Sequence, residues 1–282
     1  MAEAAELTWR FLRRHPQAAA EVLETLDADT AAAFLSGAPP RLAAPVMAAM
    51  LPYHAATCLV LTDETYAVDL LSAMPTTAAA AVLRRVPVAL TNRLLERLPA
   101  RTTFALRLLL RYPTTTVGAW MEPDITLLPA GITVCDAWDR LRREAASIDR
   151  FIYIVDREQR LIGRVASAEL LRADNDMLVD RLAVTTTASL AARDDLQAAI
   201  DLDAWRECDP LPVLSRDRRL LGVARHAALY RGAARLGDSH ADTVFTDALM
   251  ALMEAYWTGL SRLIEAPFSL LPPARRGGKY EE

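Results

Sequence analysis

The stretches FIYIVDREQRLIGRVASAEL (residues 151–170) and LPVLSRDRRLLGVARHAAL (residues 211–229) decide the fold of the second half of this chain. Each runs from an apolar strand through a charged turn and a second strand into a short helix. We expect strands and helices at Phe151–Val155, Leu161–Ala166, Ser167–Leu171, Leu211–Leu214, Leu220–Ala224 and Arg225–Tyr230. Gly163 and Gly222 lie 59 residues apart. The same spacing relates Ile125 to Val184, Asp136 to Asp195, and Leu141 to Ile200. It predicts a duplicated β-α-β-β-α unit.

Prolines divide the first half of the chain into segments of about a dozen residues. They recur at positions 40, 52, 75, 87, 99 and 113. The segments between them read as short apolar helices, for example Thr76–Val86, Val88–Leu98 and Ala100–Leu110. A proline is tolerated at the start of a helix but breaks the hydrogen-bond ladder inside one. Short helices that cannot bury their faces alone must stack, so the period predicts a superhelical array, with an irregular helical bundle as the alternative.

The composition narrows the class of protein. Hydrophobic residues make up 52% and aromatic residues 6% of the 282 residues, so the cores must be built from Ala, Leu and Val, and overall disorder is excluded. A net charge of −4 gives no sequence-wide electrostatic reason to bind nucleic acid. Cys58, Cys135 and Cys208 lie far apart, which argues against a disulfide scaffold or a zinc ribbon and favours the cytoplasm.

One stretch, Leu42–Thr62, contains no Asp, Glu, Lys or Arg. It is rich in alanine and is interrupted by Pro45, Pro52 and His54, so we expect two short buried helices there instead of a membrane span. The N-terminus lacks the apolar core of a secretory signal. We therefore expect a soluble protein with no transmembrane segment.

The duplicated unit resembles a tandem pair of CBS (cystathionine β-synthase type) motifs. The resemblance rests on the opening PDITLLPAGITVCDAWDRLR (123–142) and the closing PLPVLSRDRRLLGVARHAAL (210–229). The preceding junction YPTTTVGAWMEP (112–123) is similar to the YxxxTxGxxM(T/S)P junction of MgtE-type magnesium transporters. In that family a helical N-domain is followed by two CBS motifs, a connecting helix and a transmembrane pore. Flagellar switch proteins of the FliG type share a related helical array but have no CBS pair.

This resemblance implies a multidomain α and α/β protein. We expect an all-α superhelical array at 1–112, CBS motifs at 113–177 and 178–235, an amphipathic helix at 242–267, and a flexible tail at 268–282. The pore of the transporters has no counterpart in these residues. The boundary between array and CBS pair is expected near Tyr112–Met121.

For the family, the resemblance implies a magnesium-responsive clamp in which acidic surfaces repel one another until Mg²⁺ bridges them. The candidate Mg²⁺ ligands here are Asp174, Asp176 and Asp180, after the first CBS helix. A second acidic group comprises Asp194, Asp195, Asp201 and Asp203, and for both groups the alternative is a solvated face or helix caps. The acidic N-domain positions of the family align with Ala89 and Arg93. The segment after the second motif is basic, with Arg225, Arg231 and Arg235, and needs no cation to relieve repulsion.

CBS pairs often bind adenosine nucleotides, and a (S/T)xx(D/E) run supplies the acid that accepts hydrogen bonds from the ribose. The aligned residues are Ala166 and Glu169 in the first motif, and Arg225 and Ala228 in the second. Glu169 is therefore the candidate nucleotide-binding residue, and we expect weak or absent binding of ATP or AMP. The four histidines show no metal or catalytic spacing, so we do not expect an enzyme.

The segment Asp242–Leu271 carries apolar residues at helical spacing, with Pro267 ending the pattern. Its acidic side chains disfavour a membrane, so we expect it to pack against protein, either its own CBS pair or a second copy in a homodimer. The leading functional hypothesis is a stand-alone, non-catalytic regulatory or interaction module that contacts an unknown protein partner. The alternatives are a magnesium sensor that docks on a separately encoded transporter and, more distantly, an adenosine-nucleotide-binding regulator.

Overall fold

The computed structural model describes residues 2–144, 150–185, 188–234 and 236. The chain divides into two compact units, Met1–Ala233 and Ala234–Glu282. The architecture below is that of the first unit. The expected amphipathic helix at 242–267 and the tail at 268–282 lie outside the described residues.

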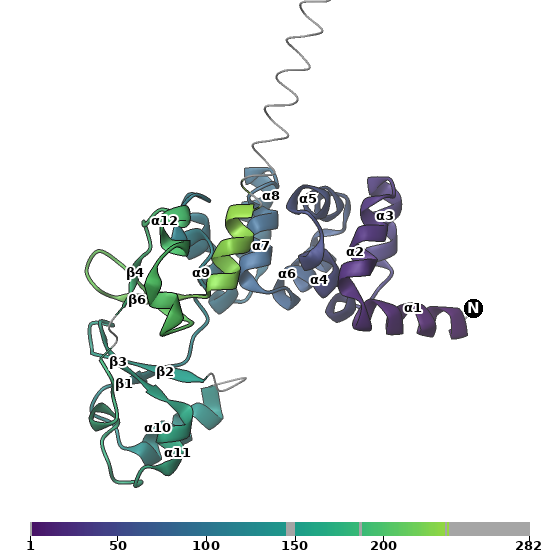
Figure 1. The fold of residues 1–282 in the computed structure, drawn as a ribbon. Helices are drawn as coiled ribbons and strands as arrows, with labels where there is room; N and C mark the ends of the chain where they lie inside the picture. The colour runs from purple at the N-terminus through teal and green to yellow at the C-terminus, as the bar shows by residue number, and fades with distance from the viewer. Residues whose placement is uncertain (1, 145–149, 186–187, 235, 237–282) are drawn as a thin grey trace, which may run out of the picture. The chain divides into compact units, whose positions relative to one another are not determined.

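The first half of the chain is an array of short helices (Figure 1). These are α1 (Ala2–Arg14), α2 (Pro16–Glu24), α3 (Ala28–Ser36), α4 (Pro40–Ala49), α5 (Pro52–Leu61), α6 (Glu64–Ala73), α7 (Thr76–Leu83), α8 (Val88–Arg97) and α9 (Ala100–Leu110). Most helices contact the second helix along the chain: α2 packs on α4, α3 on α5, α4 on α6, α5 on α7, α6 on α8 and α7 on α9. This regular stacking confirms the expected helical array.

Proline and aspartate residues begin the helices. Pro40 and Pro52 occupy the first turns of α4 and α5, and three further prolines cap α7, α8 and α9. The Asp63 side chain caps α6 by accepting the backbone N–H of Thr65 at 2.8 Å. The helices are held together by small apolar contacts between residues such as Ala43, Ala44, Met47, Leu70 and Leu106, all with no exposed surface.

Pro45 does not interrupt its segment, contrary to expectation. It lies inside α4, which continues to Ala49. A proline at this position removes one hydrogen bond from the ladder. Its neighbours Ala44 and Val46 are completely buried, so packing holds the helix through that loss. The stretch Leu42–Thr62 does form two short helices, α4 and α5, as expected.

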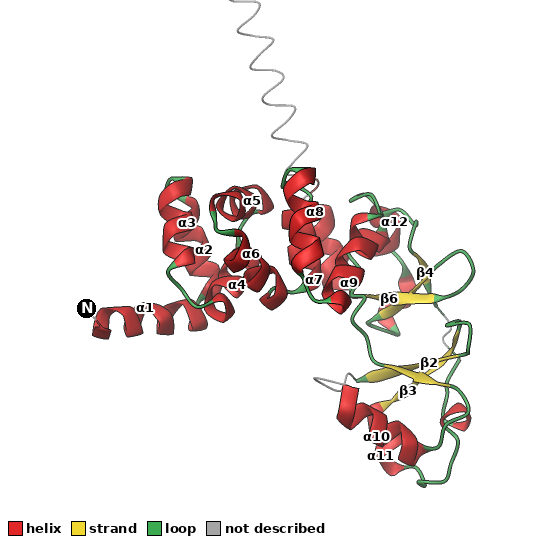
Figure 2. Cartoon of the chain, turned by 180° about the vertical axis from the view of Figure 1, so that it is seen from behind, coloured by secondary structure: helices red, strands yellow, loops and turns green. Residues whose placement is uncertain are grey.

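The second half contains two small sheets of the same topology (Figure 2). In the first, β1 (Leu127–Pro129) pairs parallel to β2 (Phe151–Val155), which pairs antiparallel to β3 (Leu161–Ala166). In the second, β4 (Leu190–Ala191), β5 (Leu211–Leu214) and β6 (Leu220–Ala224) repeat this order. The strands β2, β3, β5 and β6 have the bounds that the sequence predicts.

Alternating side chains of each sheet serve two cores. In β2, Ile152 and Ile154 point to the helices α10 (Val134–Glu144) and α11 (Ser167–Arg172), where they pack with Leu141 and Leu170. Tyr153 and Val155 of the same strand point the other way and pack with Leu214, Leu220 and Val223 of the second sheet. The second of these two cores is therefore shared by both motifs, whereas the first belongs to the first motif alone.

The spacing between the motifs is not constant, which corrects the single offset of 59 residues. The turn η1 (Val117–Ala119) corresponds to η2 (Val179–Arg181), and the helix-capping residue Thr133 corresponds to Asp195, both at an offset of 62. From the strand β2 onward the offset is 59, as Gly163 and Gly222 indicate. The difference arises because α12 (Leu196–Ile200) and the turn η3 (Asp203–Arg206) replace the longer α10. The predicted pairings of Ile125 with Val184, Asp136 with Asp195 and Leu141 with Ile200 all precede β2 and are therefore wrong.

Gly163 and Gly222 are needed because backbone crosses each of them closely. A Cβ atom at Gly163 would lie 2.9 Å from the carbonyl oxygen of Val184, and one at Gly222 would collide with the carbonyl of Glu122. The crossing segments pair with the strands: Arg164 with Val184, and Val223 with Glu122. The segment at Val184, which leads into the second sheet, therefore pairs with β3 of the first sheet. The segment at Glu122, which leads into the first sheet, pairs with β6 of the second.

Candidate functional sites in the CBS pair

The junction between the array and the sheets is tied to the second motif by backbone hydrogen bonds. The amide of Val117 donates to the Asp194 carbonyl at 3.0 Å, and the amide of Gly118 donates to the Ala192 carbonyl at 2.9 Å. The ring of Tyr112 lies against Gly118, where an added Cβ would be 2.6 Å from the Tyr112 Cγ atom. The tyrosine and glycine of the junction motif are therefore a packing pair.

Ion pairs join segments that are distant in the sequence at this junction. The Nε atom of Arg225 lies 3.0 Å from both carboxylate oxygens of Glu122, and Arg101 of α9 pairs with Asp124 at 2.8 Å. Both pairs are partly exposed, so each stabilises the fold by at most about 1 kcal/mol. Their more important consequence is that these two carboxylates already have a cationic partner from the same chain.

The helical array contains a similar pair. Arg93, which the sequence analysis aligns with an acidic position of the resembled family, lies 2.8 Å from Glu64. Arg97 is 3.5 Å from the same carboxylate and donates a hydrogen bond to Thr65 at 3.0 Å. Guanidinium groups of α8 thus neutralise the acid at the start of α6.

The predicted magnesium ligands are not assembled around one point. Both carboxylate oxygens of Asp180 accept the amide of Gly131, at 3.0 and 3.2 Å. Asp174 and Asp176 are exposed. Within residues 2–144, 150–185, 188–234 and 236, no group of three or more His, Cys, Asp or Glu side chains is arranged to hold a metal ion. These residues do not form a ready-made magnesium site, and their role as ligands stays a prediction.

The second acidic group serves the backbone. Asp194 accepts the amide of Ala191 at 2.7 Å, and Asp195 caps α12 by accepting the amide of Ala198 at 3.0 Å. Asp203 lies 3.5 Å from Arg206 in an exposed pair. Asp194 and Asp195 therefore act as turn and helix caps, the alternative that the sequence left open.

Glu169 lies in the first turn of α11 and is exposed. In the described part of the chain its side chain has no hydrogen bond or ion pair, so the carboxylate is available to a ligand. At the equivalent place of the second motif, Arg225 is paired with Glu122, and Ala228 has no acceptor. The two motifs therefore differ at the positions that the resemblance assigns to ribose binding.

A cluster that sequence reasoning missed lies on β3 and β2. The Arg164 guanidinium stacks over the Phe151 ring, 4.3 Å from its centre, and also contacts the Cys208 thiol. Cys208 is 44 residues away from Arg164 in the sequence. This contact joins the first motif to the second, so no local spacing in the sequence indicates it.

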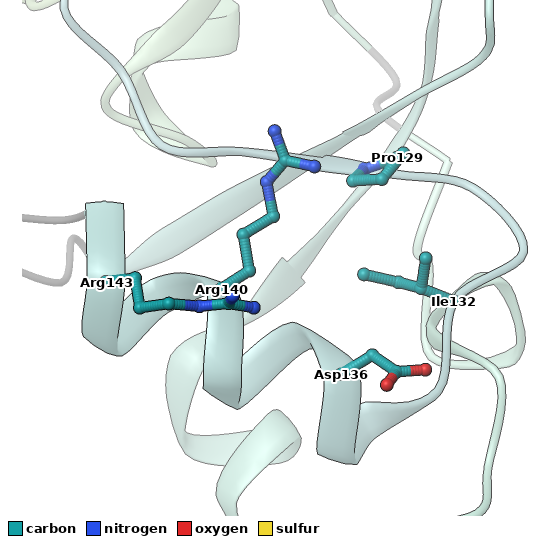
Figure 3. A pocket seen from close by; sticks show the side chains of 5 residues that line it. All are labelled: Pro129, Ile132, Asp136, Arg140 and Arg143. Atoms are coloured by element: carbon teal, nitrogen blue, oxygen red, sulfur yellow. The ribbon is translucent and has the colours of Figure 1, made fainter.

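Two surface cavities adjoin the motifs. The first, of about 280 Å³, is bordered on one side by three residues of α10 (Figure 3). They are Asp136, Arg140 and Arg143. Asp136 is hydrogen-bonded to Thr133 at 2.8 Å, and Arg143 donates to the carbonyl of Asp139 at 3.0 Å. Asp136 and Arg143 thus each bind within the helix and its cap.

The second cavity, of about 380 Å³, lies where β4 and β5 end. It is lined by Tyr112, Ala191, Ala192, Arg193, Leu214, Ser215, Arg216 and Asp217. The sequence analysis did not group these residues as a site, because they come from three separate segments. The internal repeat does indicate one of these residues, because Arg193 stands where the first motif has Gly131.

Comparison with known proteins agrees with this architecture. The family model of the MgtE intracellular N domain matches residues 14–115, and the model of the CBS domain matches residues 117–176. The chain therefore resembles an MgtE N domain followed directly by a CBS domain. The second sheet repeats the strand order of the first, which agrees with a helical array followed by a CBS pair.

Solved structures with MgtE domains share this fold. The cytosolic domain of the Mg²⁺ channel MgtE in complex with ATP superimposes with a TM-score of 0.71 at 24% identity, covering 82% of this chain and 98% of that one. The soluble part of a magnesium transporter gives a TM-score of 0.58 at 21% identity, covering 86% and 99%.

Curated relatives are longer than the matched region. The magnesium transporter MgtE of Thermus thermophilus is 28% identical over 142 residues, which is 50% of this chain and 32% of the transporter. MgtE of Enterococcus faecalis is 28% identical over 117 residues, or 41% and 26%. The match thus spans a third or less of these relatives. In the part of the chain that the structure describes, no helix combines the length and apolar character needed to cross a membrane.

Proposed function

We propose that this chain is a non-catalytic regulatory module in which an MgtE N domain and a CBS pair act together on a partner protein. One observation carries the proposal: the N-domain and CBS matches abut at residues 115 and 117, and the solved cytosolic domain of an MgtE channel is covered over 98% of its length. In this proposal the chain acts in the cytoplasm as a homodimer, held by the CBS pair and by the segment 242–267, which lies outside the described residues.

The junction is the route by which the state of the CBS pair reaches the helical array. Arg101 of α9 binds Asp124, and the indole Nε1 of Trp120 donates to the Thr114 carbonyl at 2.7 Å. Gly118 and its neighbour bind the backbone that follows β4. A ligand that displaces the ends of the CBS strands would therefore alter contacts made directly after α9.

The exposed apolar side chains of the array are the proposed partner surface. Val88 of α8 is 76% exposed and Phe104 of α9 is 73% exposed, although both are large apolar residues. Apolar side chains of this exposure cost little when isolated but gain free energy when a partner covers them.

Purification of the tagged full chain from its native cells tests this proposal. We expect a protein partner in stoichiometric amounts, and we expect its loss with Phe104→Glu. Leu171→Glu is the matched control, because Leu171 is 69% exposed on the CBS helix α11. Absence of any stoichiometric partner, or equal loss with both variants, would contradict the assignment of the partner surface to the array.

A magnesium sensor that docks on a separately encoded transporter is the alternative. It is supported by the relatives and neighbours named as magnesium transporters and channels. The described residues do not fit a ready-made Mg²⁺ site, because Glu64, Glu122 and Asp124 are paired with arginine and Asp180 is bound to an amide. We therefore favour the interaction module.

A third possibility is a regulatory module whose ligand is an adenosine nucleotide. Glu169 supports such a site in the first motif only. Its carboxylate is exposed and available, and the related cytosolic domain was solved with ATP. Calorimetry of the full chain with ATP tests this assignment. Any binding should be weak and abolished by Glu169→Gln, whereas Glu158→Gln, an exposed control in the turn before β3, should leave it unchanged. Binding that survives Glu169→Gln would place the nucleotide elsewhere.

A further inference from the structure

The cavity at the ends of β4 and β5 combines two arginines with an aromatic wall. Arg193 follows β4 and Arg216 follows β5, so two different segments bring their guanidinium groups to one hollow. In the part of the chain described by the structure, neither guanidinium has a hydrogen bond or an ion pair. The cavity at α10 differs in this respect, because Arg143 there is bound to its own helix. Two unengaged arginines facing one hollow attract an anion.

The other lining residues favour a flat apolar body attached to that anion, although the Asp217 carboxylate partly offsets the charge of the two arginines. Tyr112 forms one wall, and its ring is held in place against Gly118. Ala192 and Leu214 contribute buried apolar surface. The Ser215 hydroxyl accepts the amide of Arg219 at 3.1 Å, which leaves its proton to donate to a ligand.

The first motif shows that these features are specific to the second. Gly131 stands at the position of Arg193, and Asp156 stands at the position of Ser215. Asp156 accepts the amide of Arg160 at 2.8 Å, as Ser215 does for Arg219, so the turns are equivalent. In the second motif a carboxylate is replaced by a hydroxyl and a glycine by an arginine. Both changes make this end of the second motif more favourable to an anion.

We propose that this cavity binds a small organic anion, namely a phosphate or carboxylate group carried on a flat, aromatic-sized body. The volume of about 380 Å³ is sufficient, since a closed cavity of about 150 Å³ already holds benzene. The anionic group lies between Arg193 and Arg216, and the flat body lies against Tyr112. Because Tyr112 belongs to the junction, occupancy stabilises the packing of the junction on the second motif.

Titration of the full chain with phenyl phosphate at low salt tests the site, by calorimetry and ligand-observed NMR. We expect saturable binding that weakens as NaCl is added. Arg193→Gln and Arg216→Gln should each weaken it by about tenfold or more. Arg157→Gln is the matched control, because Arg157 occupies the same turn position in the first motif and is also exposed. It should change the affinity by less than about twofold.

Four outcomes overturn the proposal. Absence of saturable binding at millimolar phenyl phosphate refutes the site. Equal weakening by Arg157→Gln and Arg216→Gln shows general charge attraction. If benzyl alcohol binds as tightly as phenyl phosphate, the arginines have no role. If inorganic phosphate binds as tightly as phenyl phosphate, the flat body has no role. Circular dichroism of the variants, whose changes lie on the surface, checks that each chain is folded.

Discussion

Replacing Gly118 by alanine tests the packing of the junction most sharply. The added Cβ would lie 2.6 Å from the Tyr112 Cγ atom and 2.7 Å from the Ala192 carbonyl oxygen. Relief by backbone movement would stretch the hydrogen bond from the Gly118 amide to that carbonyl, now 2.9 Å. Overpacking of this kind costs about 1–3 kcal/mol and loss of the hydrogen bond about 1 kcal/mol. We expect the free energy of unfolding to fall by about 2–4 kcal/mol.

Urea unfolding followed by circular dichroism measures this change. Gly37→Ala is the control, because Gly37 has a helical φ of −77° and its added Cβ would lie 3.5 Å from the nearest atom, a normal contact. The control should change the free energy of unfolding by about 1 kcal/mol or less. If Gly118→Ala unfolds at the same urea concentration as Gly37→Ala, the close packing described for the junction is wrong.

Three further changes probe the helical array. Arg84→Met removes the guanidinium that donates to the Leu109 carbonyl in the last turn of α9 at 2.7 Å, and should lower the free energy of unfolding by about 1–3 kcal/mol. The exposed control Arg85→Met should change it by about 0.5 kcal/mol or less in the same urea titration. Burial raises the pKa of the Cys58 thiol, so a thiol reagent should modify exposed Cys135 in the folded chain and Cys58 only after unfolding; early loss of Cys58 would contradict its burial. The amide of Thr65 lowers the pKa of Asp63 below its unfolded value, so its contribution to stability is present above about pH 4 and is lost as pH falls through the lowered pKa. Asp63→Asn, which still accepts the amide, should reduce that loss of the urea midpoint on acidification, and an unchanged pH profile would refute the assignment.

The secondary structure was predictable where one local rule dominates. Prolines begin most helices of the array, and apolar runs around charged turns gave the bounds of β2, β3, β5 and β6. Pro45 was misjudged because the burial of its neighbours, which holds α4 together, is a property of the packed array. The spacing of the repeat was misjudged because α12 is shorter than α10, and an offset of 59 still aligned chemically similar residues.

The candidate sites were predictable only in part. The sequence alone places Glu169 at the start of a CBS helix, and its exposure follows from that position. The partners of the carboxylates could not be predicted, because they are distant in the chain: Arg225 and Glu122 are 103 residues apart. Asp180 looked like a metal ligand in the sequence, but the turn at Gly131 brings an amide to its carboxylate.

The central claim is that Glu64 of the array and Glu122 and Asp124 of the junction are already paired with the chain's own arginines, so that the module does not need Mg²⁺ to hold these segments together. Small-angle X-ray scattering of the full chain tests it directly, in millimolar MgCl₂ and in NaCl of the same ionic strength. Screening acts equally in the two salts, whereas bridging requires the divalent ion. The account predicts the same radius of gyration in both series. Compaction in MgCl₂ alone would contradict it and establish the magnesium sensor.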